Sequence, residues 1–130
     1  HEGQLTWKQE GLVKCQDLGA WWSAQNGGLP LPLGANVIHK RIRPDDRAVI
    51  SGILQSSIRY GLEHREAAVA YALQFARDMD HALADRFVGM YVNHWTLDYG
   101  RRGREAIRRL FSMAYASGLI PRNPELEFVS

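Results

Sequence analysis

The chain has 130 residues, of which 45% are hydrophobic and 23% are charged. These proportions are typical of a globular domain and exclude a disordered or fibrous chain, and the length is sufficient for one domain with a genuine core. The formal net charge of +2 at pH 7 is too small to favour nucleic-acid binding through bulk electrostatics. Cys15 is the only cysteine, which excludes an internal disulfide and a cysteine-rich zinc site and favours a reducing, cytoplasmic compartment. No apolar run approaches the roughly 20 residues that a membrane-spanning helix needs.

The first 33 residues are predicted to hold short helices and one strand. Residues 1–10 suit one or two turns of weak helix. Residues 12–16 have the composition of a short strand. Asp17 is placed to cap a helix over residues 18–25, which the following Asn-Gly-Gly ends.

The stretch Leu-Pro-Leu-Pro-Leu-Gly-Ala-Asn at residues 29–36 divides the chain into two unlike parts. Its prolines remove backbone donors and bias the preceding residues toward extended geometry, so no helix continues through it. Gly34 permits a close backbone approach or a positive φ, and Asn36 offers a donor and an acceptor. This composition is that of a segment crossing beside a cleft, and an edge strand whose prolines block further pairing is the plainer alternative. Residues 35–40 are the best strand candidate in the chain.

Four helices are predicted in the rest of the chain, because apolar residues recur there at helical spacing. The expected helices cover about 44–60, 65–77, 82–95 and 104–117, with a glycine-bearing loop over 96–103. Gly61 and Gly118 are expected to end the first and the last of them. Four helices normally cover a larger sheet than two or three strands provide. The predicted fold class is therefore α/β, with part of the sheet missing.

The histidines give little support for a metal site. None of the five shows the spacing of a zinc-protease helix, so no metal is expected. His1 is a separate case, because a free N-terminal histidine chelates copper and because expression tags also leave histidines at this end. The residues alone leave these alternatives open.

Three other groups of residues have two interpretations each. Five arginines cluster near the last predicted helix, at Arg101, Arg102, Arg104, Arg108 and Arg109. A solvated helix face is the favoured interpretation, because no aromatic residues interleave to stack on bases. Trp21 and Trp22 are expected to place one ring in the core and the other partly at the surface, although the pair could line a ligand pocket. Asn93 suits a backbone cap and a ligand contact equally well.

Short motifs follow one another along the whole chain: His1-Glu2-Gly3-Gln4-Leu5-Thr6-Trp7, Asp17-Leu18-Gly19 with Trp21-Trp22, Leu29-Pro30-Leu31-Pro32-Leu33-Gly34 with Asn36, Ser57-Ile58-Arg59-Tyr60, His64-Arg65-Glu66, Tyr91-Val92-Asn93 and Gly118-Leu119-Ile120-Pro121. Each motif is modest, but their order is specific. By this order the chain resembles the C-terminal half of the 1,4-dihydroxy-6-naphthoate synthase family of the futalosine route to menaquinone. Trp7 stands where that family more often has tyrosine, which keeps an aromatic body and loses a hydroxyl.

The resemblance implies the helix-rich C-terminal portion of a fold similar to type II periplasmic binding proteins. In that fold two α/β lobes are joined by crossing strands and hold the ligand between them. Residues 1–33 would end the second lobe, residues 34–42 would form a crossing strand, and residues 43–130 would be a helical portion that packs on the first lobe. The N-terminal half of the fold would be absent, so the chain is expected to meet that missing half or to associate with itself.

The resemblance also implies a lyase that splits cyclic dehypoxanthinyl futalosine to 1,4-dihydroxy-6-naphthoate and a three-carbon sugar fragment without a cofactor. His1 falls on the histidine proposed as the family's catalytic base, a role that suits an imidazole near neutral pH. Gly34 and Asn36 are the predicted substrate-binding residues. The expected partner is this small-molecule substrate, with no nucleic acid and no membrane, and the chain alone is expected to be inactive.

Three alternatives remain open. A solute-binding protein of the same fold would use the cleft without chemistry. A chorismate dehydratase-like enzyme of menaquinone biosynthesis shares the fold, although it is not expected to carry the His-Glu-Gly-Gln-Leu-Thr run. An independent helical interaction domain with a basic last helix would be retained on nucleic acid in a salt-dependent manner.

Overall fold

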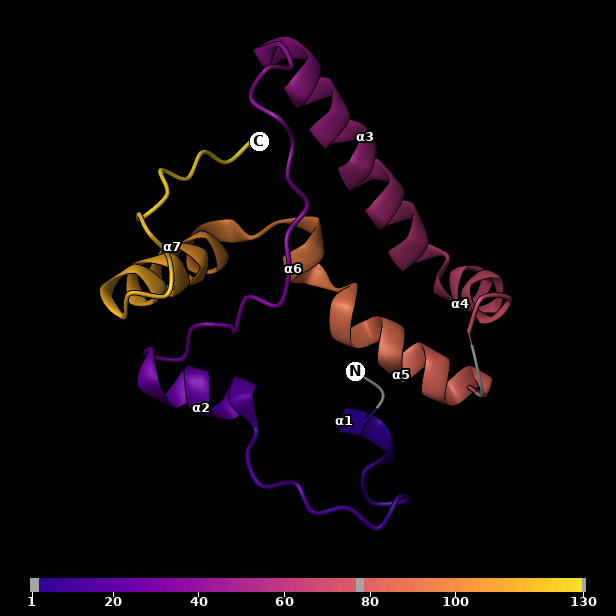
Figure 1. Cartoon of the computed structure of the whole chain (residues 1–130). Coiled ribbons are helices and arrows are strands. Elements are labelled where there is room, and N and C mark those ends of the chain that lie inside the picture. The colour runs from indigo at the N-terminus through magenta and orange to yellow at the C-terminus, as the bar shows by residue number, and fades with distance from the viewer. Residues whose placement is uncertain (1–2, 77–78, 130) are drawn as a thin grey trace. The chain divides into compact units, whose positions relative to one another are not determined.

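The computed structural model describes residues 3–76 and 79–129. Within these ranges the chain forms seven helices and no strand (Figure 1). The helices are α1 (Gly3–Thr6), α2 (Leu18–Gln25), α3 (Pro44–Glu63), α4 (Arg65–Leu73), α5 (His81–Tyr91), α6 (His94–Leu97) and α7 (Gly100–Ala116).

The chain divides into two compact units, each built from two stretches of sequence. The first unit comprises His1–Cys15 and Ile53–Asp98, and the second unit comprises Gln16–Gly52 and Tyr99–Ser130. Helix α3 passes from the second unit into the first. The first unit therefore holds α1, α4, α5 and α6, whereas the second holds α2 and α7.

The two predicted strands do not form, so the α/β prediction is wrong for the described part of the chain. Residues 12–16 and 35–40 have no regular structure apart from a turn at Lys40. A strand requires a neighbouring backbone to take up its donors and acceptors. In the described residues, no segment forms a ladder of backbone hydrogen bonds with either stretch, and Leu12 makes only a single turn bond to Trp7. Strand-like composition alone therefore does not produce a strand here.

Two helices begin at capping aspartates, and the cap predicted at Asp17 is confirmed. Asp17 caps α2, because its Oδ1 accepts a hydrogen bond of 3.0 Å from the backbone N–H of Ala20. Asp80 caps α5 in the same way, with 2.7 Å to the N–H of Leu83. The predicted range of α2 is confirmed, and Gly118 follows α7 with a φ of 69° as its C-terminal position predicts.

Several predicted boundaries are wrong. The helices expected over 65–77 and 82–95 are shorter, because α4 ends at Leu73 and α5 at Tyr91. Gly61 lies inside α3 and does not end it, because a glycine within a helix costs only about 1 kcal/mol and packing or continuity outweighs that cost. The predicted loop over residues 96–103 contains the end of α6 and the start of α7. Asn93 starts the short helix α6, and its cap separates α6 from α5.

Helices α4 and α5 form the core of the first unit. Val69 on α4 is 1% exposed and Ala84 on α5 is 3% exposed, so each of the two helices buries a small apolar side chain. Arg65 adds a polar link to Asp85 through two hydrogen bonds. Its guanidinium also lies beside Gly89, where a Cβ would be 2.9 Å from Nη2, so a larger residue there would make the end of the Arg65 side chain shift.

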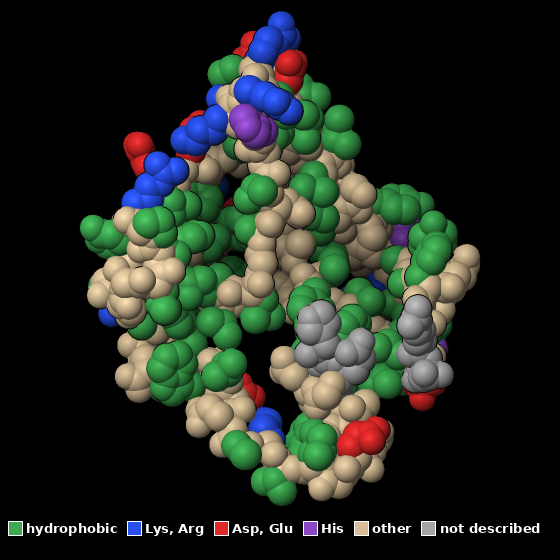
Figure 2. Space-filling view, viewed as in Figure 1, with side chains coloured by type: hydrophobic (Ala, Val, Ile, Leu, Met, Phe, Trp, Pro, Cys, Tyr) green, Lys and Arg blue, Asp and Glu red, His purple; other side chains and the backbone are tan. Residues whose placement is uncertain are grey.

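Helix α3 keeps a stripe of large apolar side chains open to solvent. The exposed members are Val49, Ile50, Ile53, Leu54 and Tyr60, with Ile53 exposed to 65%. Their helical spacing places them on one side of α3. Ile50, Ile53 and Leu54 were predicted to share this stripe, and Val49 and Tyr60 extend it. Figure 2 shows many hydrophobic side chains (green) at the surface. The apolar face of α3 therefore exists but is not buried by the described residues.

Candidate functional site

The turn that ends α2 is built around a buried tryptophan and a buried asparagine. Trp22 is 2% exposed and Asn26 is 8% exposed. The side chain of Asn26 donates from Nδ2 to the carbonyl oxygen of Trp22 over 3.0 Å. Gly27 and Gly28 then adopt φ values of 61° and 76°, a left-handed conformation that glycine enters without a Cβ penalty. The chain thus leaves α2 in a fixed direction.

The same tryptophan binds the residues that follow the turn. The indole Nε1–H of Trp22 donates to the carbonyl oxygen of Pro30 over 3.0 Å. The N–H of Leu29 donates to the carbonyl oxygen of Asn26 over 3.2 Å, and the Leu29 side chain is buried. These bonds fix the start of the Leu-Pro stretch against α2.

Two arginines of α7, which lies near the C-terminal end of the sequence, bind this turn. Arg109 donates from Nε to the Oδ1 of Asn26 over 3.1 Å. Arg102 donates from Nη2 to the carbonyl oxygen of Gly28. The paired residues are 83 and 74 positions apart in sequence, so no local pattern could have indicated these contacts. Sequence reasoning missed this role of the arginine cluster.

Two other arginines of the cluster lie on an aromatic ring. The guanidinium groups of Arg104 and Arg108 lie 5.5 Å and 5.1 Å from the ring centroid of Phe128, within the range of cation–π attraction. Tyr99 meets the same ring edge-on, with the centroids 6.3 Å apart. The cluster therefore binds groups of its own chain, and the interpretation as a purely solvated face is incomplete.

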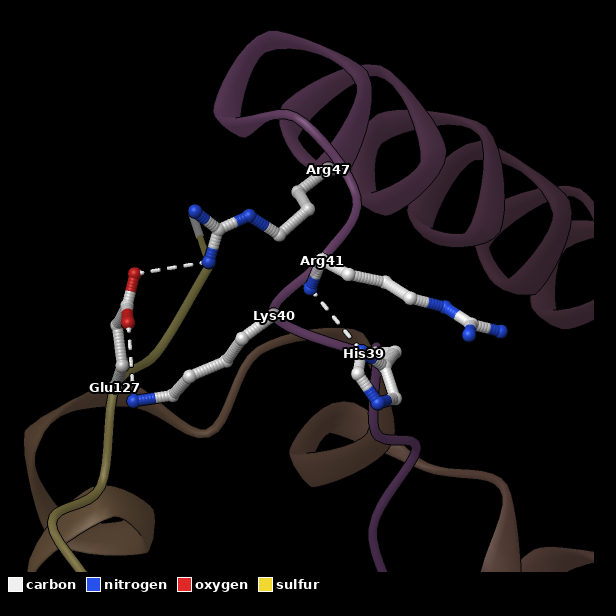
Figure 3. Close-up of polar contacts among 5 residues, drawn as sticks. All are labelled: His39, Lys40, Arg41, Arg47 and Glu127. Atoms are coloured by element: carbon white, nitrogen blue, oxygen red, sulfur yellow. Dashed lines mark hydrogen bonds and ion pairs between the residues drawn. The ribbon is translucent and has the colours of Figure 1, made fainter.

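A second set of polar contacts lies just before and within the first turn of α3 (Figure 3). Glu127 pairs with Lys40 over 3.5 Å and with Nη1 of Arg47 over 3.1 Å. The ring Nδ1 of His39 accepts a hydrogen bond of 3.1 Å from the backbone N–H of Arg41. Basic side chains gather around this start of α3 in Figure 2. Glu127 therefore ties residues 40–47 to the C-terminal part of the second unit.

Residues 31–38, called the connecting segment below, run between these two anchored regions (Figure 1). Among the described residues, its backbone makes no hydrogen bond to any other segment. Its donors and acceptors are therefore available to a ligand or to another polypeptide. Both predicted binding residues of this stretch, Gly34 and Asn36, lie in it and are exposed.

Gly34 shows neither of the two features that the chain itself could require of a glycine. Its φ is not positive, and a Cβ added there would meet no heavy atom within 4 Å. Binding by Gly34 and Asn36 thus stays a prediction.

His1, the predicted catalytic base, lies outside the described residues. Residues 3–15, which follow it, belong to the first unit, whereas Gly34 and Asn36 belong to the second. Helix α1 forms the weak turn predicted for this end, and Gly11 follows with a φ of 66°. The role of His1 also stays a prediction.

Asn93 and the tryptophan pair have structural roles. The Oδ1 of Asn93 accepts from the N–H of Trp95 over 3.0 Å, while the Thr96 hydroxyl accepts from the N–H of Asn93 over 3.3 Å, which completes a capping box. The capping interpretation of Asn93 is therefore confirmed. Trp21 is 47% exposed whereas Trp22 is buried, as the sequence predicts for adjacent tryptophans.

The described residues contain neither a metal-binding cluster nor a helix suited to cross a membrane. No group of three or more His, Cys, Asp and Glu side chains in residues 3–76 and 79–129 is placed to hold a metal ion. None of the helices in the same ranges has the length and apolar character needed to cross a membrane.

Comparison with known proteins identifies the family. A sequence model of the family described as "Menaquinone biosynthesis" matches residues 1–116, and the chain belongs to this family. The chain is 36% identical over 121 residues to the 1,4-dihydroxy-6-naphtoate synthase of Streptomyces coelicolor. The aligned region covers 93% of this chain and 43% of that relative. It is 36% identical over 129 residues to the protein of the same name from Thermus thermophilus, and this alignment covers 99% of this chain and 47% of that relative. The resemblance inferred from the ordered motifs is thereby confirmed.

A solved structure has a similar fold over most of the chain. The X-ray crystal structure of protein AF1704 from Archaeoglobus fulgidus matches with a TM-score of 0.86 and 38% sequence identity. The match covers 92% of this chain and 45% of that chain. The chain thus spans less than half the length of each of these relatives.

Proposed function

We propose that the chain is part of a lyase that splits cyclic dehypoxanthinyl futalosine to 1,4-dihydroxy-6-naphthoate and a three-carbon sugar fragment. The observation that carries this proposal is the family match over residues 1–116 together with two relatives of that name at 36% identity. The chain alone is proposed to be inactive, because each relative uses more than twice the length that the chain spans.

His1 is proposed as the general base, and Gly34 and Asn36 as substrate-binding residues. The cleavage needs a proton removed from a sugar carbon or hydroxyl, and a neutral imidazole accepts a proton at the pH of the cell. The exposure of Gly34 and Asn36 supports their role, as does the backbone around them, which makes no hydrogen bond to another segment in the part of the chain that the structure describes. A bare glycine lets a planar ligand approach the main chain, and an amide side chain orients it through a donor and an acceptor.

The reaction is proposed to take place in the cytoplasm without a cofactor. Cys15 is a free and exposed thiol, which suits a reducing compartment. Formation of an aromatic product drives the elimination, so positioned acid–base groups are sufficient for the chemistry.

The complete fold is proposed to be similar to type II periplasmic binding proteins, with the substrate between two lobes. The exposed apolar stripe of α3, formed by Val49, Ile50, Ile53, Leu54 and Tyr60, is then the face that packs on polypeptide corresponding to the part of the relatives that this chain does not span. Apolar side chains of this size contribute about 1.5–3 kcal/mol each when fully buried. Burial of these five side chains against another polypeptide would therefore be strongly favourable.

The test uses the complete gene product incubated with cyclic dehypoxanthinyl futalosine, with product detection by mass spectrometry. We expect substrate loss and a matching gain of 1,4-dihydroxy-6-naphthoate. A parallel incubation with chorismate serves as the specificity control, because a dehydratase of the same fold would consume chorismate instead. If calorimetry shows binding of either compound and no turnover occurs, the protein is a solute-binding protein and the proposed lyase activity is wrong.

A further inference from the structure

We propose that Trp22, Asn26 and Arg109 are positioning residues, which fix the direction of the connecting segment and thereby place Gly34 and Asn36. The part of this inference that concerns ligand binding rests on the proposed function. The part that concerns positioning rests on contacts within the second unit.

The three residues are linked by hydrogen bonds, in which Asn26 binds the backbone of Trp22 and the Trp22 side chain binds Pro30. Arg109 donates to the Oδ1 of Asn26, and Asn26 donates from Nδ2 to the carbonyl oxygen of Trp22. The Trp22 indole then donates to the carbonyl oxygen of Pro30. Both ends of the Asn26 amide are therefore engaged, so rotation of this side chain would break two bonds at once. The series runs from α7 through α2 to the first residues of the Leu-Pro stretch.

Burial of Trp22 and Asn26 makes the loss of a hydrogen-bond partner costly. Trp22 and Asn26 are almost fully inaccessible to solvent, so water does not readily replace a lost partner. A buried polar group without a partner costs about 1–3 kcal/mol. The indole of Trp22 is a donor only, and the carbonyl of Pro30 is its acceptor. A phenylalanine at position 22 would fill most of the same space but could not hold Pro30.

The connecting segment depends on its two ends. Among the described residues, its backbone forms no hydrogen bond to another segment, so its position follows from the Trp22 bond at one end and from the Glu127 ion pairs at the other. Ordering a free residue costs about 1–2 kcal/mol of backbone entropy. A segment that is already anchored loses less of this entropy when a ligand binds. The anchors thus act on ligand affinity through Gly34 and Asn36.

The first experiment compares Trp22→Phe with Trp21→Phe, the same chemical change one residue apart. Trp21 is half-exposed, and its indole makes no hydrogen bond among the described residues, so Trp21→Phe is a matched control. Backbone ¹⁵N relaxation is measured in the complete gene product for the non-proline residues 31–37. We expect order parameters to fall from near 0.85 toward 0.6 in Trp22→Phe alone. Equal order in both variants would overturn the positioning role.

A second pair keeps the inference testable if Trp22→Phe does not fold. Arg109→Met removes only the bond to Asn26 from an exposed side chain, and Arg101→Met is the control, because Arg101 makes no such contact in the described ranges. We expect amide hydrogen exchange at Gly28 and Leu29 to accelerate about fivefold in Arg109→Met, since one hydrogen bond contributes about 1 kcal/mol. An unchanged rate at both amides would contradict the series of bonds.

Steady-state kinetics separates positioning from general stability. With cyclic dehypoxanthinyl futalosine, we expect KM to rise about tenfold in Trp22→Phe while kcat changes less, because the variant loses preorganised binding. A loss of active enzyme with unchanged KM would show a merely structural role and would overturn the inference for the ligand. Absence of turnover in the unmodified protein would defeat the proposed function alone, since the relaxation and exchange results do not depend on turnover.

Discussion

Arg65 holds Asp85 at two points, because its guanidinium donates to both the carboxylate and the backbone carbonyl oxygen of that residue. The Nε to Oδ1 distance is 2.6 Å, and the two side chains are 34% and 42% exposed. Asp85→Ala removes the carboxylate bond and leaves the backbone bond in place. We expect the free energy of unfolding to fall by about 1 kcal/mol, since solvent screens part of the ion pair. Urea denaturation of the complete gene product measures this change.

Glu66→Ala provides the control for that prediction. The Glu66 carboxylate lies 3.3 Å from the ring of His81, but its side chain is 90% exposed. Exposed pairs of this kind contribute little to stability, so no measurable change is expected. Equal losses in the two variants would show that the Arg65 contact has no special role in joining α4 to α5.

Two glycines are predicted to respond in opposite directions to the same substitution. Gly118 has a φ of 69° and Gly52 lies within α3 without a positive φ, and a Cβ at either would meet no heavy atom within 4 Å. Gly118→Ala should therefore cost about 1 kcal/mol from backbone strain alone. Gly52→Ala should stabilise by about 0.5–1 kcal/mol, because alanine loses less entropy in a helix. Thermal unfolding gives both signs, and a shared sign would contradict the assigned backbone conformations.

Local chemistry made several features predictable from sequence. Asp17 and Asp80 each bind a backbone N–H three residues ahead, so the signal for each helix start lies within one turn of chain. The same holds for Gly118, whose position after α7 requires a left-handed conformation. The order of short motifs was enough to identify the family, because it extends over the whole chain.

Non-local chemistry made other features unpredictable. The bond of Arg109 to Asn26 joins residues 83 positions apart, and neither residue type signals the other. The strands predicted over 12–16 and 35–40 failed for a related reason, since a strand depends on a partner that composition does not reveal. Gly34 and Asn36 were predicted from the Leu-Pro pattern around them. The role proposed for Trp22 rests on its bond to Pro30, which no sequence pattern signals.

The apolar stripe of α3 is predicted to drive association when the 130-residue chain is studied alone. We expect concentration-dependent oligomers in sedimentation velocity, because the stripe would otherwise stay in water. Ile53→Asp should shift the chain toward monomer, since it places a charge in the middle of the stripe. Ala48→Asp adds the same charge on the opposite side of α3 and should leave the association unchanged. A stable monomer at all concentrations would count against a face made for packing.

The pH dependence of the complete enzyme is predicted to report the base proposed at His1. A general base acts in its neutral form, and an ordinary histidine has a pKa of about 6.5. The value of kcat/KM should therefore be full above this pH and fall about tenfold per pH unit well below it. His1→Ala should lower kcat by about 10²- to 10⁴-fold and remove this acid limb, while Asn36→Ala should raise KM and leave the profile in place. A chelator should have no effect, since the proposed base works without a metal ion. Loss of activity with a chelator would instead favour copper binding at this histidine. If His1→Ala retains full activity with an unaltered profile between about pH 5 and pH 8, where the ring titrates, the proton is removed by another group.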